Sequence, residues 1–150
     1  MQEKEKFVRR FREVQPKFTR FFAQRLVRAR LTLPQFALLT QLLDQDRVSM
    51  TELSRRLHIS KPAVTSLADR LEKNKFLKRL THPGDRRVSP IQILQKGEKL
   101  VRTVQAQALG VLLKTLGTFN AEEKRTISHF YGRLSQTLDR ALAETKKARK

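Results

Sequence analysis

The sequence predicts a mainly α-helical chain that carries one small β wing, or hairpin. Apolar residues recur at three- and four-residue spacing in several long segments, which is the pattern of amphipathic helices. Three of these segments begin with Thr, Ser or Asn followed three residues later by Gln or Glu, which is typical of a helix start. One central stretch differs, because two short alternating runs flank a turn that contains Pro, Gly and Asp.

The composition indicates a polyanionic partner. The 150 residues, enough for one ordinary domain, include 33 Lys and Arg but only 14 Asp and Glu, so the net charge is +19. Such an excess favours nucleic acid, and less often an anionic membrane surface. The chain has no cysteine, which excludes disulfides and thiolate metal sites. We expect a cytoplasmic protein, because we find neither a signal peptide nor an apolar run of membrane-spanning length.

The first thirty residues predict an amphipathic, strongly basic helix. Phe7, Phe11 and Phe18 belong to one apolar stripe, and arginines fill the other faces. Pro16 lies inside this pattern and predicts a kink or break near residues 12–16. So many phenylalanines on one helix need a partner surface to cover them.

Three shorter helices are predicted next. The first starts at Thr32 and runs to about Leu43, and the second starts at Ser49 and ends at Leu57. After a tight turn at residues 58–59, Ser60 can cap a third helix that continues to about Asn74, with a proline in its first turn. Two short helices joined by a tight turn form the helix-turn-helix pattern.

The hairpin and two final helices complete the chain. The predicted strands span residues 76–81 and 88–94, and Pro90 places the second strand at an edge or makes it locally irregular. Apolar residues at helical spacing from Leu100 to Leu116 then predict one helix. Another helix starts at the capping-box sequence of Asn120 and Glu123 and carries apolar residues as far as Leu142.

A helix-turn-helix followed by a basic hairpin favours binding to duplex DNA. The second helix of such a pair fits the major groove and presents the residues near its N-terminus to base edges. Arginines at the hairpin tip can enter the adjacent minor groove, and an aspartate beside them can fix their direction. The residues predicted to face DNA are Thr51, Arg55, Ser60, Lys61, Pro62, Ala63, Thr65, Ser66, Arg70, Asp85, Arg86 and Arg87.

The run from Leu31 to Leu100 resembles the MarR family of winged helix-turn-helix transcriptional regulators. The matching pieces, in order, are LPQF at 33–36, TELSRRL at 51–57, SKPAVT at 60–65, DRLEK at 69–73, GDRR at 84–87 and KG at 96–97. Three positions depart from the family's pattern. Lys75 replaces a glycine, so Asn74 is expected to take the left-handed conformation instead. Gln95 replaces a threonine that caps the following helix. Pro90 is unusual in the second strand of the wing.

The resemblance implies a homodimer that reads a pseudo-palindromic operator. Residues 1–31 and 95–147 would form dimerisation helices around a DNA-binding lobe at 32–94, all in a single domain of residues 1–150. It also implies a bacterial or archaeal, nucleoid-associated protein that acts as a repressor and is released by a small anionic or phenolic effector. The residues assigned to dimerisation are Phe7, Phe11, Phe18, Leu112, Phe130, Leu134 and Leu138.

Two other binding functions stay open, and an enzyme is not expected. The distributed charge also suits an architectural DNA-binding protein with little sequence preference, and the fold suits a protein-interaction module. We find no nucleophile with an activating base and no phosphate-binding glycine loop. The three histidines are isolated in the sequence, so we expect no metal site and no cofactor.

Overall fold

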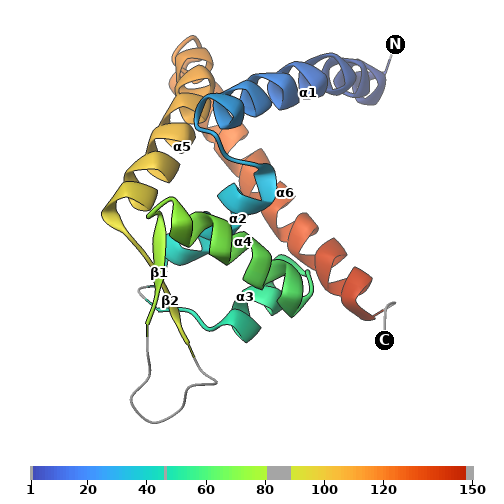
Figure 1. Cartoon of the computed structure of the whole chain (residues 1–150). Helices are drawn as coiled ribbons and strands as arrows, with labels where there is room; N and C mark the ends of the chain where they lie inside the picture. Colours follow the sequence, from blue (N-terminus) through green and yellow to red (C-terminus); the bar gives the residue numbers. More distant parts are fainter. Residues whose placement is uncertain (1, 46, 81–88, 148–150) are drawn as a thin grey trace. The chain divides into compact units, whose positions relative to one another are not determined.

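The computed structural model describes residues 2–45, 47–80 and 89–147, and these segments are mainly helical with one two-stranded sheet (Figure 1). The predicted fold class is confirmed. Residues 1–108 and 109–150 form two compact units. The elements are α1 (Glu3–Arg28), α2 (Leu33–Leu43), α3 (Met50–Leu57), α4 (Lys61–Lys73), β1 (Leu77–Arg79), β2 (Ile91–Ile93), α5 (Gln95–Leu116) and α6 (Ala121–Lys147).

α1 is one continuous helix, so the predicted break at residues 12–16 is wrong. Pro16 lacks the N–H that would bond to the carbonyl of Arg12. All side chains of residues 11–20 are exposed, so water can satisfy that carbonyl. An ion pair also spans the proline, because Glu13 lies 3.1 Å from Lys17, and Glu13 pairs in addition with Arg10 at 3.2 Å. The hydrogen bond from Lys17, and then that from Arg10, lowers the pKa of Glu13.

Reciprocal caps start two of the helices as the sequence predicts. At α2, the Thr32 hydroxyl accepts from the backbone N–H of Gln35 at 3.4 Å, and the side-chain amide oxygen of Gln35 accepts from the backbone N–H of Thr32 at 2.9 Å. At α6, Asn120 and Glu123 form the same pair of bonds, at 3.0 and 2.8 Å. These side chains satisfy N–H groups that have no partner within the helix.

The hydrophobic core lies entirely within the first compact unit. It begins with Leu26 in α1, includes α2, α3, α4 and both strands, and ends with Val104 in α5. Phe22 and Phe36 extend it with an edge-to-face ring contact at 5.4 Å between centroids. The side chains with no exposed surface at all are Leu38, Leu39, Leu53, Val64, Ala68, Leu71, Ile91 and Val101. The helix-turn-helix therefore shares one core with the end of α1, both strands and the first half of α5.

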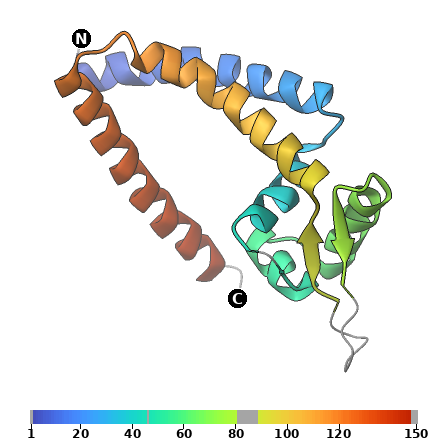
Figure 2. The same cartoon turned by 90° about the vertical axis from the view of Figure 1, so that its left-hand side faces the viewer.

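The sheet is a short antiparallel pair, β1 beside β2, as Figure 2 shows. Leu77 lies opposite Ile93, and Arg79 opposite Ile91. Residue Val48, before α3, adds an isolated bridge to Ile91. β2 starts directly after Pro90, whose carbonyl accepts from the Leu80 N–H at 2.8 Å. Proline thus stands just outside the described strand, where its missing N–H does not interrupt the ladder.

The end of α4 departs from the sequence prediction. Asn74 keeps φ at −85°, whereas Lys75 has φ of 59°, so the left-handed residue is Lys75 and the expectation for Asn74 was wrong. The reason is the hydrogen bonding of the helix end. The N–H of Phe76 bonds to the carbonyl of Leu71 at 3.0 Å and that of Lys75 to Glu72 at 2.9 Å. This Schellman arrangement requires the left-handed residue directly after the cap residue Asn74.

Candidate nucleic-acid interface

The start of α4 is fixed by Ser60. Its backbone is extended, and its hydroxyl accepts from the Ala63 N–H at 3.3 Å. Pro62 stands in the first turn, where its missing N–H costs nothing. The opposite side of the helix places Val64 and Leu71 in the core. Local sequence therefore decides both where α4 begins and which face it presents to solvent.

The exposed face of α4 brings most of the predicted DNA-facing residues together. An open hollow on this face is lined by Lys61, Pro62, Thr65, Ser66, Asp69 and Arg70. All six are exposed, whereas Ala63 is half-buried. Two cations, two hydroxyls and one carboxylate on one face of a helix can bond both to phosphates and to base edges.

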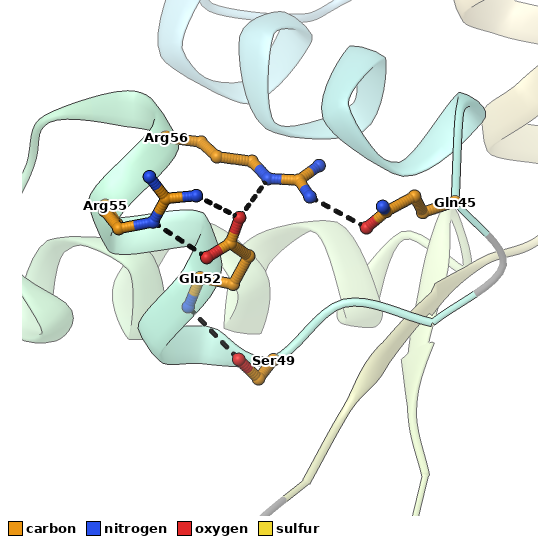
Figure 3. A network of polar contacts seen from close by, with 5 residues as sticks. All are labelled: Gln45, Ser49, Glu52, Arg55 and Arg56. Atoms are coloured by element: carbon orange, nitrogen blue, oxygen red, sulfur yellow. Dashed lines mark hydrogen bonds and ion pairs between the residues drawn. The ribbon is translucent and has the colours of Figure 1, made fainter.

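Arg55 and Arg56 are held by an ion pair that the sequence reasoning missed. Figure 3 shows both guanidinium groups converging on the carboxylate of Glu52. Arg55 donates twice, at 2.9 and 2.6 Å, and Arg56 donates to Glu52 at 2.6 Å and to Gln45 at 2.8 Å. Hydrogen bonds from Arg55 and then Arg56 lower the pKa of Glu52 to about 2.

This network changes the roles predicted for α3. The Glu52 carboxylate does not complete the capping box expected with Ser49, whose hydroxyl only accepts from the Glu52 N–H at 3.1 Å. Arg55 is well exposed and, of its five N–H donors, uses two on Glu52. Its remaining donors stay available, as does the exposed side chain of Thr51 at the start of α3.

A second network, around Arg79, joins α4 to the hairpin. The guanidinium lies 2.6 Å from Asp69 and 3.1 Å from Glu72, both in α4. The Glu72 carboxylate also accepts from the backbone N–H of Arg79 at 3.0 Å. Arg79 was not among the predicted site residues, although two acids three residues apart on a helix signal a nearby cation. Its contacts fix the position of β1 against the exposed face of α4.

The first turn of α5 holds the end of α4. The Lys96 ammonium donates to the Asn74 carbonyl at 3.0 Å and lies 4.8 Å from the centre of the Phe76 ring. The adjacent Gly97 packs so closely that a Cβ there would stand 2.2 Å from the Phe76 carbonyl oxygen. α4 is therefore anchored at its start, along its length and at its end.

The three predicted residues of the hairpin tip, Asp85, Arg86 and Arg87, lie outside the described residues.

The residues assigned to dimerisation form exposed apolar stripes on the single chain. Each is between 37% and 59% exposed, and other large apolar side chains of α5 and α6, such as Leu113 and Leu142, are exposed as well. In the described part of residues 109–150 no hydrophobic side chain belongs to the buried core. So many large exposed apolar side chains on three helices are unusual for a monomer.

Other kinds of site find little support. Within residues 2–45, 47–80 and 89–147, no three His, Asp or Glu side chains gather closely enough to hold a metal ion. The described helices include none that is both long and apolar enough to span a bilayer.

Comparison with known proteins finds similarity to one family of regulators. Residues 31–89 match the MarR family model. YsmB of Bacillus subtilis, named as an HTH-type transcriptional regulator, is 32% identical over 93 residues, which are 62% of this chain and 64% of YsmB. The repressor MdtR of the same organism is 24% identical over 129 residues, 86% of this chain and 81% of MdtR. The match to the first of these relatives, YsmB, spans just under two thirds of its length. Both relatives are named as regulators of transcription, in agreement with the expectation that the chain is not an enzyme.

Solved structures share the fold. YusO from Bacillus subtilis superposes with a TM-score of 0.79 at 22% identity, covering 88% of this chain and 94% of YusO. A MarR family protein from Bacillus stearothermophilus gives 0.76 at 26% identity, covering 93% and 99%. A variant of MepR from S. aureus, solved bound to an oligodeoxyribonucleotide, gives 0.70 at 21% identity, covering 88% and 97%. The winged helix-turn-helix prediction is therefore confirmed at the level of the fold.

Proposed function

We propose that this chain is a member of the MarR family and a homodimeric transcription regulator that binds duplex DNA in a sequence-dependent way. The observation that carries the proposal is the exposed face of α4. It combines Lys61, Thr65, Ser66 and Arg70 on one side of a helix whose other side is buried. Small polar side chains let the helix approach base edges, and the two cations reach phosphates or guanine.

Selection of bound duplexes from a random pool tests whether α4 reads sequence. The wild type should enrich one motif with two related half-sites. Lys61→Ala and Thr65→Ala should change the preferred base at one position in each half-site, since a good base contact is worth about 1–3 kcal/mol. Lys73→Ala, an exposed α4 lysine outside the hollow, is the matched control and should keep the motif. An identical motif from all three variants would contradict base reading by α4.

The hairpin tip is proposed as a second DNA contact on its sequence alone. Removing Arg86 and Arg87 together should remove about two phosphate contacts. The slope of log binding constant against log salt concentration should then become shallower by about 2. An unchanged dependence on salt would exclude these arginines from the interface.

The exposed stripes of α1, α5 and α6 support the homodimer. Burying Phe11, Leu134 and their neighbours against a second copy would remove apolar surface that the single chain leaves in water. Sedimentation should give twice the 17.5 kDa chain mass. Leu134→Asp should shift this toward the monomer, and His129→Asp, on the other side of α6, should not. A wild-type monomer at the concentrations where DNA is bound would contradict the dimer.

We further propose repression that a small anionic or phenolic effector relieves. MdtR, a relative named as a repressor, supports the first part. For the second, the Arg25 side chain stacks on the Phe21 ring at 4.5 Å, and its buried Nε has no hydrogen-bond partner among the described residues. An anionic aromatic ligand would supply both an acceptor and a ring.

A panel of aromatic carboxylates and phenols tests the effector. At least one compound should raise the melting temperature and weaken DNA binding, and Arg25→Gln should abolish both effects while Arg28→Gln keeps them. If no compound acts on the wild type, or if Arg25→Gln responds equally, the effector site is not at Arg25.

A further inference from the structure

The cations of α1 fall into two groups. Lys6 pairs with Glu3, and Arg10 and Lys17 pair with Glu13. In contrast, the structure gives no ion pair or hydrogen bond among the described residues to the exposed side chains of Lys4, Arg9, Arg12, Arg20 and Arg28. Five of the nine basic residues of α1 are therefore free to bind an external anion.

Three of these side chains, Arg9, Arg12 and Arg20, lie on the side of α1 away from the apolar stripe, which we term the arginine face. With 3.6 residues per turn, Arg9 and Arg20 lie roughly opposite Phe18 and Arg12 lies about 120° from it, whereas Arg28 lies at the edge of the stripe. Two open hollows mark this surface. One includes Arg9 and Arg12 in its lining, and the other includes Arg20 and Arg28. Glu5 also lines the first hollow, but its carboxylate accepts from the Gln2 N–H at 3.2 Å.

We propose that the arginine face of α1 binds the phosphate backbone of a second DNA duplex, so that one protein molecule holds two duplexes together. From Arg9 to Arg20 the helix rises about 17 Å, roughly the length of five base pairs. Guanidinium groups bind phosphate oxygens with paired N–H donors. Contacts to phosphate oxygens carry no sequence information, so this contact reads charge and not sequence.

The arrangement of α1 favours DNA over an anionic membrane as the partner. A helix that lies on a bilayer inserts its apolar side, so α1 would bind a membrane only with the stripe of Phe7, Phe11 and Phe18 inserted. The proposed dimer already covers that stripe with a second copy of the chain. The same arrangement lets the stripe pack against protein while the arginine face stays open to a polyanion.

Two triple variants of equal charge test the proposal. Arg9→Gln, Arg12→Gln and Arg20→Gln remove free arginines, whereas Lys6→Gln, Arg10→Gln and Lys17→Gln remove three paired cations from the same helix. Energy transfer between a donor-labelled and an acceptor-labelled copy of one duplex measures bridging. This duplex carries the selected motif, or an arbitrary sequence where selection enriches none. Circular dichroism and sedimentation should give the same helicity and assembly for both triples.

The wild type should bring the two labelled duplexes together in a salt-dependent way. The triple variant that removes free arginines should bridge duplexes at least about tenfold less, while it still binds one duplex. The slope of log bridging constant against log salt concentration should become shallower by about 2–3. The paired-cation triple should keep bridging within about twofold. Equal losses from both triples, or a wild type that binds one duplex without bridging, would overturn the proposal, as would capture by anionic vesicles in place of a second duplex. Bridging without any enriched motif would support the arginine face and contradict sequence reading by α4, so the two proposals fail separately.

Discussion

Replacing Lys75 with glycine should stabilise the protein. The backbone at this position has φ of 59°, which costs an L-residue about 1–2 kcal/mol relative to glycine. The greater freedom of glycine in the unfolded chain offsets this by up to about 1 kcal/mol. Lys75 is exposed, and the described residues include no hydrogen-bond or ionic partner for its side chain, so little else is lost. The expected net gain is about 0.5–1 kcal/mol.

The alanine variant at the same position isolates the backbone term. Lys75→Ala removes the same side chain but keeps a Cβ in the left-handed region, so its free energy of unfolding should stay close to that of the wild type. Thermal melts at one fixed protein concentration should place Lys75→Gly about 1–4 °C above Lys75→Ala. Equal melting temperatures for the two variants, or a lower one for glycine, would refute the reasoning.

Three further substitutions probe the anchors described above. Hydrogen bonds from neighbouring arginines hold the pKa of Glu52 at about 2, below its ordinary 4.5, so the ionised carboxylate stabilises the fold above about pH 4.5 and this contribution is lost as the pH falls towards 2. In Glu52→Gln the free energy of unfolding should therefore fall less than in the wild type as the pH is lowered from about 4.5 to 2. An equal fall in both proteins would count against the network. Gly97→Ala should cost about 2 kcal/mol or more in urea unfolding, because its Cβ would meet a carbonyl oxygen at 2.2 Å. Gly132→Ala, with no atom within 4 Å of its Cβ, should cost nothing, and equal costs would contradict the packing argument. Ser60→Ala should lose about 1 kcal/mol of stability and weaken DNA binding, whereas Ser60→Thr should retain the cap, and identical unfolding curves for both would contradict the cap assignment.

The sequence was sufficient to predict features that depend on neighbouring residues. The caps at Thr32, Ser60 and Asn120 join atoms two or three positions apart, so their spacing along the chain already determines the contact. The grouping of Lys61, Thr65 and the residues beside them on one face follows from the helical repeat alone.

Features that depend on competition between interactions were missed. Arg79 finds Asp69 ten residues earlier only because β1 packs beside α4. At Pro16, helix breaking was predicted from the lost hydrogen bond, but exposure to water and the ion pairs of Glu13 offset that loss. At the end of α4, side-chain preference favoured Asn74 for the left-handed residue, whereas the hydrogen bonds of the Schellman arrangement assign that conformation to Lys75.

The anchoring of α4 has a consequence for how such a regulator would change its affinity for DNA. Ser60 fixes where the helix starts, Arg79 ties its middle to β1, and Lys96 ties its end to α5. A rotation of α4 alone would break the contacts of Arg79 and Lys96 and open the packing at Gly97. A displacement of the first turn of α5 together with α4 and β1 breaks none of them. Effector control of the proposed dimer should therefore act by moving the lobe as one body and changing the separation of two reading helices, with the shape of each reading face preserved.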